Sequence, residues 1–182
     1  MKLISCAVNW MADQTRIRVI GDSLPHPTGP SVQTLRIPGY VQSQPHTCGY
    51  VAGLMILHYF RPDYPAERFY QRIRPHQRWG VSRSRLRDTL RLCGVRSTWH
   101  RDLDFQQITE TIDQDQPIAL LVNKTEYCKH WVVAYGYGRR PNRLFVAGNG
   151  LPLLSRKQYP YGVFRTHFWV DPGSGLVCAG PR

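Results

Sequence analysis

The chain has 182 residues, of which 42% are hydrophobic and 12% aromatic. This length and composition predict one folded domain over residues 1–182, and they exclude both a disordered chain and two domains of ordinary size. The formal net charge is +12, and no apolar run in the sequence is long enough to cross a membrane.

Residues 1–37 are expected to form an irregular lead-in with short strands at 17–20 and 35–37. The first residues lack the pattern of a signal peptide. The five cysteines are widely spaced and include no CxxC pair, which disfavours a disulfide framework and a zinc ribbon. We therefore expect a cytoplasmic protein that uses no metal and no cofactor, with secretion as an effector left open.

Four helices are predicted in the middle of the chain. The run Val51–Phe60 is almost entirely apolar, so a helix there must be buried on all sides. Pro65 is typical of a helix start, and Ser82 and Asp104 are suitable N-caps for two further helices. The predicted helices cover residues 48–60, 66–74, 83–93 and 105–114.

Strands are predicted after Pro117. The short connection between the strands at 130–137 and 143–147 indicates an antiparallel hairpin. Helices followed by strands are typical of the α+β class, here an N-terminal helical half with a buried helix packed on a C-terminal antiparallel sheet. The predicted strands cover residues 117–122, 130–137, 143–147 and 164–170.

Cysteine chemistry is predicted at the start of the buried helix. Cys48 at a helix N-terminus favours a thiolate nucleophile, and His130 at the start of an apolar strand is a candidate base. Asn149, after the next strand, is placed to orient the imidazole, with Asp171 as the alternative third member. Gln42 supplies an amide N–H that, with the backbone N–H of Cys48, would form an oxyanion hole.

Three neighbours of these residues are candidates for the substrate cleft. Gly49 allows close approach of a backbone or a substrate, His46 lies two residues before Cys48, and Trp131 follows His130. Cys128 and His130 form a Cys-x-His pair, but no second pair completes a metal site.

The residues Gln42, Cys48-Gly49 and His130-Trp131-Val132-Val133 resemble the papain-like cysteine peptidases, in particular standalone relatives of the bacteriocin-processing, double-glycine leader peptidases. The resemblance covers roughly residues 38–160 and implies a bacterial enzyme with a papain-like fold. It implies that Cys48 is the nucleophile, His130 the general base and acid, and Gln42 the oxyanion donor. Thr47 departs from the Asp common in that branch, and Asn149-Gly150 replaces its Asp-Pro.

The sequence therefore predicts a thiol-dependent peptidase or amidase that acts on a protein or peptide. A deamidase or transglutaminase-type effector with the same triad is the first alternative. A non-catalytic basic binding module is the second, because residues 61–101 contain eleven Arg and three acidic residues. Such a stretch suits an acidic protein partner, with nucleic acid as the less favoured ligand.

Overall fold

The computed structural model describes residues 19–20, 27–40, 42, 44–125, 128–148 and 155–181. For residues 19–20, 124–125, 128 and 155–156 the structure describes the backbone alone. The helical elements are η1 (Pro45–Thr47), α2 (Cys48–Phe60), α3 (Ala66–Ile73), α4 (Arg83–Leu92), α5 (Phe105–Asp113), α6 (Tyr161–Val163) and the π-helical turn η2 (Phe164–Phe168). The strands are β1 (Val19–Ile20), β2 (Val32–Thr34), β3 (Gly39–Tyr40), β4 (Arg96–His100), β5 (Ile118–Thr125), β6 (Cys128–Arg139), β7 (Asn142–Gly148), β8 (Ser155–Pro160) and β9 (Gly175–Ala179).

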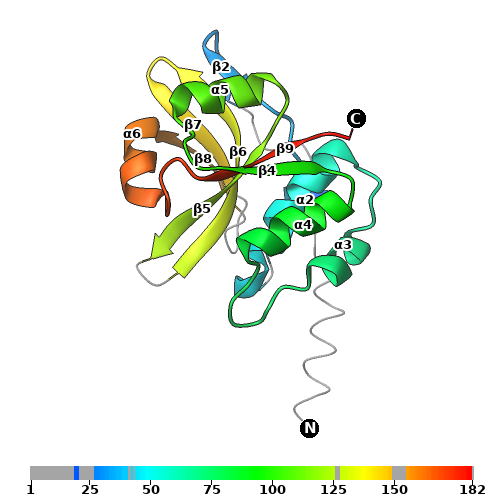
Figure 1. The fold of residues 1–182 in the computed structure, drawn as a ribbon. Coiled ribbons are helices and arrows are strands. Elements are labelled where there is room, and N and C mark those ends of the chain that lie inside the picture. Colours follow the sequence, from blue (N-terminus) through cyan, green and yellow to red (C-terminus); the bar gives the residue numbers. More distant parts are fainter. Residues whose placement is uncertain are drawn as a thin grey trace.

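A seven-stranded antiparallel sheet forms the centre of the molecule. Its strand order is β4-β9-β5-β6-β7-β8, and β2 pairs with the end of β6, beyond the start of β5. Helices α2, α3 and α4 lie together at one side of this sheet, and α5 and α6 lie toward the other side (Figure 1). This is the predicted α+β arrangement of a helical half on an antiparallel sheet.

Helix α2 is the central helix of the helical half. Every residue from Cys48 to Leu57 is buried, as the apolar run predicts, because a helix without a polar face requires apolar neighbours on all sides. It packs against β6, α3 and α4. The predicted bounds of this helix are confirmed.

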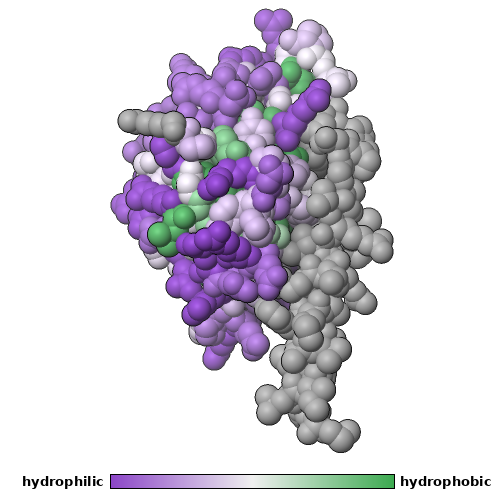
Figure 2. Space-filling model, turned by 90° about the vertical axis from the view of Figure 1, so that its right-hand side faces the viewer, coloured by the Kyte–Doolittle hydropathy of each residue, from purple (hydrophilic) through white to green (hydrophobic). Residues whose placement is uncertain are grey.

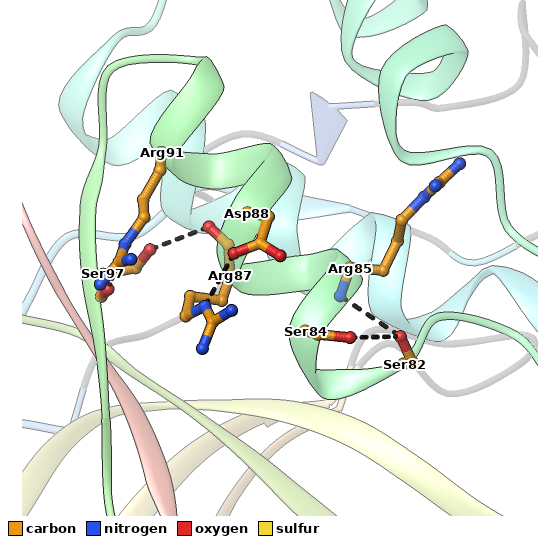
Figure 3. A network of polar contacts seen from close by, with 7 residues as sticks. All are labelled: Ser82, Ser84, Arg85, Arg87, Asp88, Arg91 and Ser97. Atoms are coloured by element: carbon orange, nitrogen blue, oxygen red, sulfur yellow. Dashed lines mark hydrogen bonds and ion pairs between the residues drawn. The ribbon is translucent and has the colours of Figure 1, made fainter.

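Helix α4 is fixed at both ends by side chains (Figure 3). The Ser82 hydroxyl accepts a hydrogen bond from the backbone N–H of Arg85 at 3.2 Å, which makes it the predicted N-cap. At the other end, Ser97 of β4 donates its hydroxyl to the carbonyl of Arg87, and Arg91 donates to the carbonyl of Ser97. These contacts hold the helix against the edge strand of the sheet.

A buried polar contact joins β3 to the end of α2. The Tyr40 hydroxyl is hydrogen-bonded to Nδ1 of His58, and Nε2 of His58 lies 2.7 Å from the carbonyl oxygen of Tyr64. Since a carbonyl only accepts, Nε2 carries the proton and Nδ1 accepts from Tyr40. Burial lowers the pKa of His58 and raises the pKa of Tyr40 to about 12. The neutral pair positions the chain just before Gln42.

One prediction about the lead-in is wrong. Residues 35–37 form no strand, and the strands lie on either side of them, at β2 and β3. Pro38, which has no N–H to donate to a ladder, separates residues 35–37 from β3. Leu35 still donates its backbone N–H to the carbonyl of Tyr135 at 2.7 Å. The lead-in, for which short strands were expected, contributes β2 to the main sheet. Of the strand predicted at 17–20, the described part is β1.

The strand predicted at 164–170 is also wrong. Residues 161–168 are helical, in α6 and η2, and β8 precedes them. Phe164 and Phe168 lie one turn apart, and both pack on the ring of Tyr159, with ring centroids 5.8 and 4.9 Å away. An extended strand would send these two rings out of reach of a single neighbour. Trp169 keeps one antiparallel bridge, to Val122.

Strands β4 and β9 were not expected from the sequence. They pair with each other, and β9 connects β4 to β5. A turn precedes β9, in which Ser174 donates its N–H to the carbonyl of Asp171 at 2.8 Å. The sheet thus extends to β4, which packs against α4 of the helical half.

Candidate active site

The segment before Cys48 is a tight loop organised by one carbonyl. The carbonyl oxygen of Gln44 accepts from the Gln42 side-chain amide, from the Thr47 hydroxyl at 2.8 Å and from the Thr47 N–H at 3.1 Å. Gln42 is 3% exposed. These bonds hold the Gln42 amide within the loop that leads into Cys48. They also give Thr47 a structural role in the loop that does not require the carboxylate of an Asp at this position.

Cys48 is the first residue of α2 and is 7% exposed. It forms no disulfide. The 3-10 turn η1 enters the helix directly, so the thiol lies at the N-terminal end, where the helix dipole favours negative charge. The structure therefore has Cys48 in the local setting that the sequence indicates.

His130 lies near the start of β6 and is 8% exposed. It is paired with Val122 of β5 in the antiparallel ladder. Its neighbour Trp131 is buried, and the indole N–H donates to the backbone carbonyl of Val81 at 2.9 Å. This bond joins the start of β6 to the segment that precedes α4.

Close packing joins the chain neighbours of Cys48 and His130. A Cβ built on Gly49 would lie 2.6 Å from Cβ of Val81 and 2.9 Å from Cδ1 of Trp131. Real Cβ atoms do not approach so closely, so only glycine allows this contact. The residue after Cys48 therefore touches the residue after His130, and the start of α2 lies beside the start of β6.

The remaining predicted site residues have different positions. His46 lies in η1, half-buried, with its backbone carbonyl beside Gly80, where an added Cβ would be 3.2 Å away. Asn149 lies outside the described residues. β7 ends at Gly148, which is paired with Val132 of β6, two residues from His130.

Asp171, the alternative third member, is in contact with an arginine. Arg83 donates a hydrogen bond to the Asp171 carboxylate, and the Arg83 guanidinium lies 4.9 Å from the centre of the Trp99 ring. Trp99 in turn packs edge-on against Trp131, with ring centroids 6.4 Å apart. Asp171 is thus connected through packed side chains to the residue beside His130.

Val81, Arg83 and Trp99 were not identified from the sequence as neighbours of the site. Their positions depend on contacts between residues 16 to 88 positions apart, which leave no local pattern. The sequence does offer a signal for a turn before α4. Gly80 lies two residues before the Ser82 N-cap, and glycine at such a position favours a tight turn.

In the described residues, no group of three His, Cys, Asp or Glu side chains could hold a metal ion. None of the helices in the described part of the chain is long and apolar enough to span a bilayer. Two other thiols, Cys93 and Cys178, are buried in the core and not in disulfides. Burial raises the pKa of the Cys178 thiol well above its ordinary value.

The close contact at Gly49 predicts that a larger residue at this position destabilises the fold. Gly49→Ala is expected to lower the free energy of unfolding by about 2 kcal/mol, since overpacking outweighs the roughly 1 kcal/mol that alanine gains in a helix. The measurement is urea denaturation followed by circular dichroism. Gly162→Ala in α6 is the matched control, because no atom lies within 4 Å of its added Cβ; it should be neutral or slightly stabilising. Equal stability of the two variants would contradict the packing of Trp131 on α2.

Several solved structures are similar in fold to this chain. A double glycine motif protease from an AMS/PCAT transporter, in complex with its leader peptide, has a TM-score of 0.62 and 15% identity, covering 80% of this chain and 93% of that one. The peptidase domain of Streptococcus ComA, a bi-functional ABC transporter involved in a quorum sensing pathway, has a TM-score of 0.62 and 15% identity, covering 78% and 96%. A C39-like peptidase from Bacillus anthracis has a TM-score of 0.64 and 14% identity, covering 81% and 97%.

No protein-family model matches the sequence, and no curated protein matches it. At 14–15% identity the structural likeness shows the fold alone. The chain therefore has the papain-like α+β fold of C39 peptidase domains, which is the fold that the sequence resemblance implied.

Proposed function

We propose that this chain is a papain-like cysteine peptidase that hydrolyses a peptide or amide bond. Cys48 attacks the carbonyl carbon as a thiolate, and the bond to the leaving amine breaks as His130 protonates its nitrogen. The resulting thioester on Cys48 is hydrolysed by a water whose proton returns to His130. Gln42 and the backbone N–H of Cys48 donate to the oxyanion in both steps.

The observation that carries this proposal is the packing of Trp131 and Val81 on Gly49. This packing holds the start of α2 against the start of β6. Cys48 directly precedes Gly49 and His130 directly precedes Trp131, so the thiol and the imidazole belong to the two segments that are in contact. The buried loop of Gln42 precedes the same helix. A thiol, a base and an amide donor so arranged are the parts that acyl transfer requires.

Asn149 is proposed as the residue that orients the His130 ring. This proposal is supported by the pairing of Gly148, the residue before Asn149 in the sequence, with Val132, which is two residues from His130. Asp171 is the alternative, and its carboxylate already accepts a hydrogen bond from Arg83. Val122 of β5 pairs with His130 on one side and forms a bridge with Trp169 on the other. Asp171, two residues after Trp169, therefore lies across β5 from His130, and for this reason we favour Asn149.

The substrate is proposed to be a peptide or protein. One solved neighbour is a complex with a leader peptide, so peptides with a Gly-Gly sequence are the first to test. The same thioester would also form if the substrate were a glutamine side chain, with ammonia as the leaving group. Deamidation and transglutamination are therefore the alternatives within the same chemistry.

The test is incubation of the wild-type chain and Cys48→Ala with a mixture of peptides that includes Gly-Gly sequences and glutamine, followed by mass spectrometry. New termini in the wild-type sample alone are expected. A heavier peptide of unchanged length would indicate deamidation instead. Cys93→Ala, which removes another buried thiol, should retain the activity. Turnover by Cys48→Ala at the wild-type rate would refute the proposal.

An acidic partner on the arginine-rich stretch is a second candidate. A surface groove of about 720 Å³ is lined at its basic side by Arg91, Arg96 and His100, and none of its lining residues in the described part of the chain is acidic. Figure 2 shows a largely hydrophilic face on the side of the molecule that carries the helices. The arginines of the groove would attract acidic ligands in a salt-dependent way, whether as a substrate guide or as the function of a binding module.

A further inference from the structure

The turn at residues 76–80 is closed by four internal hydrogen bonds. His76 and Gly80 exchange both backbone hydrogen bonds, at 2.8 and 2.7 Å. Nδ1 of His76 accepts from the backbone N–H groups of Arg78 and Trp79, at 3.1 and 3.2 Å. Gly80 has a φ of 65°, in the left-handed region that favours glycine. These bonds define the backbone of the turn, and therefore the direction in which each Cα–Cβ bond leaves it.

This turn lies beside the N-terminal end of α2. Gly80 approaches the backbone carbonyl of His46, two residues before Cys48. Val81, the next residue, touches Gly49 and accepts the hydrogen bond from Trp131. Ser82 then caps α4, so the segment is held on its other side as well (Figure 3). The turn is thus attached to both sides of Cys48.

Trp79, at the tip of the turn, is 73% exposed. The guanidinium of Arg78 lies over its indole, 4.7 Å from the ring centroid, and the ring is otherwise available to solvent. A single exposed apolar side chain needs no explanation by itself. Trp79 differs because the two residues that follow it, Gly80 and Val81, contact the residues on both sides of Cys48. Tryptophan and arginine are also among the residues most enriched in binding hot spots.

We propose that Trp79 and Arg78 form a wall of the substrate cleft that binds an aromatic or branched apolar side chain of an extended peptide, next to an acidic residue. The indole face packs on the apolar side chain, and the guanidinium pairs with the carboxylate. This inference rests on the proposed function, because it assumes that a peptide lies over Cys48. It specifies a substrate class that the fold does not determine.

The test uses alkylating peptides, which require only a thiol at residue 48. Rates of Cys48 modification are measured by mass spectrometry for iodoacetyl-Gly-Phe-amide and iodoacetyl-Gly-Gly-amide. The wild-type chain is expected to react about tenfold faster with the phenylalanine reagent. One aromatic contact, together with the apolar area that it buries, stabilises the bound reagent enough for a ratio of this size. Trp79→Ala should bring the ratio close to one, and Trp79→Phe should retain part of it.

Leu92→Ala is the matched control, because Leu92 is 71% exposed on α4 and lies at the end of that helix away from the turn. It should leave the ratio unchanged. Arg78→Gln should reduce the preference for iodoacetyl-Gly-Phe-Glu-amide over the corresponding glutamine reagent by a factor of about three. An unchanged phenylalanine-to-glycine ratio in Trp79→Ala would overturn the inference.

These outcomes are separable from failure of the proposed function. If Cys48 reacts with plain iodoacetamide no faster than an ordinary thiol, the catalytic proposal fails, yet the ratio between the two peptide reagents still reports on Trp79. If Cys48 is activated and Trp79→Ala does not change the ratio, the peptidase proposal stands and the substrate wall is wrong.

Discussion

Cys48 is expected to react with iodoacetamide at pH 6 at least tenfold faster than a thiol of ordinary pKa. Free cysteine has a pKa of about 8.5, so only a fraction of a per cent is thiolate at that pH, whereas cysteines paired with an imidazolium or at helix N-termini have pKa values of about 3.5 to 7.5. Labelling is followed for each cysteine by mass spectrometry between pH 5 and 10.

The direction of this result is informative because Cys48 is buried. Burial alone disfavours the thiolate and raises a thiol pKa, as it does for Cys178. Cys48 at 7% exposure would therefore label slowly if it were only a core cysteine. Cys93 and Cys178 are internal references of that kind, and they should be labelled only when the chain unfolds.

His130→Ala should slow the labelling of Cys48 most strongly near pH 6 and have little effect above about pH 9, where an ordinary thiol is ionised in any case. The loss of the ion pair raises the pKa of Cys48, so the labelling curve moves to higher pH. His167→Ala is the control, since His167 is exposed in η2. If Cys48 is indifferent to His130 and no faster than the references, the triad is wrong and the basic groove becomes the leading candidate.

The helices were predictable because their signals are local. Ser82 and Asp104 act as the expected caps, and Asp104 forms a complete capping box with Gln107. The apolar run of α2 required burial whatever surrounded it. Phe164–Phe168 shows the limit of this reasoning: aromatic and branched residues at short spacing suit either a strand or a helix. Contacts with Tyr159 decided the outcome.

The candidate site was partly predictable for a similar reason. A Cys-Gly at the start of an apolar helix and a His at the start of an apolar strand are local patterns. The contact that joins them is not, because Gly49, Val81 and Trp131 come from three separate parts of the chain. Glycine at position 49 is meaningful only once Trp131 is seen against it. The same holds for Trp79, whose position beside α2 depends on Gly80 and His46.

Gln42→Ala is expected to lower kcat for peptide cleavage by about 10² to 10³-fold, the usual cost of removing one oxyanion donor. KM should change little, because the ground-state carbonyl carries no full charge and gains less from the donor. Gln42 gives one amide hydrogen to Gln44, and we assign the other to the oxyanion. The measurement is steady-state hydrolysis of a cleaved peptide from the mixture described above.

Two comparisons make this result specific to the oxyanion. Thr47→Val removes the hydroxyl that donates to the same Gln44 carbonyl and should cost about 1 kcal/mol of stability while leaving the amide donor in place, so kcat should fall less than tenfold. Alkylation by iodoacetamide displaces iodide and forms no oxyanion, so Gln42→Ala should label at the wild-type rate. Equal losses in hydrolysis and in labelling would mean that Gln42 supports the thiol or the loop, and that the oxyanion donor is another group.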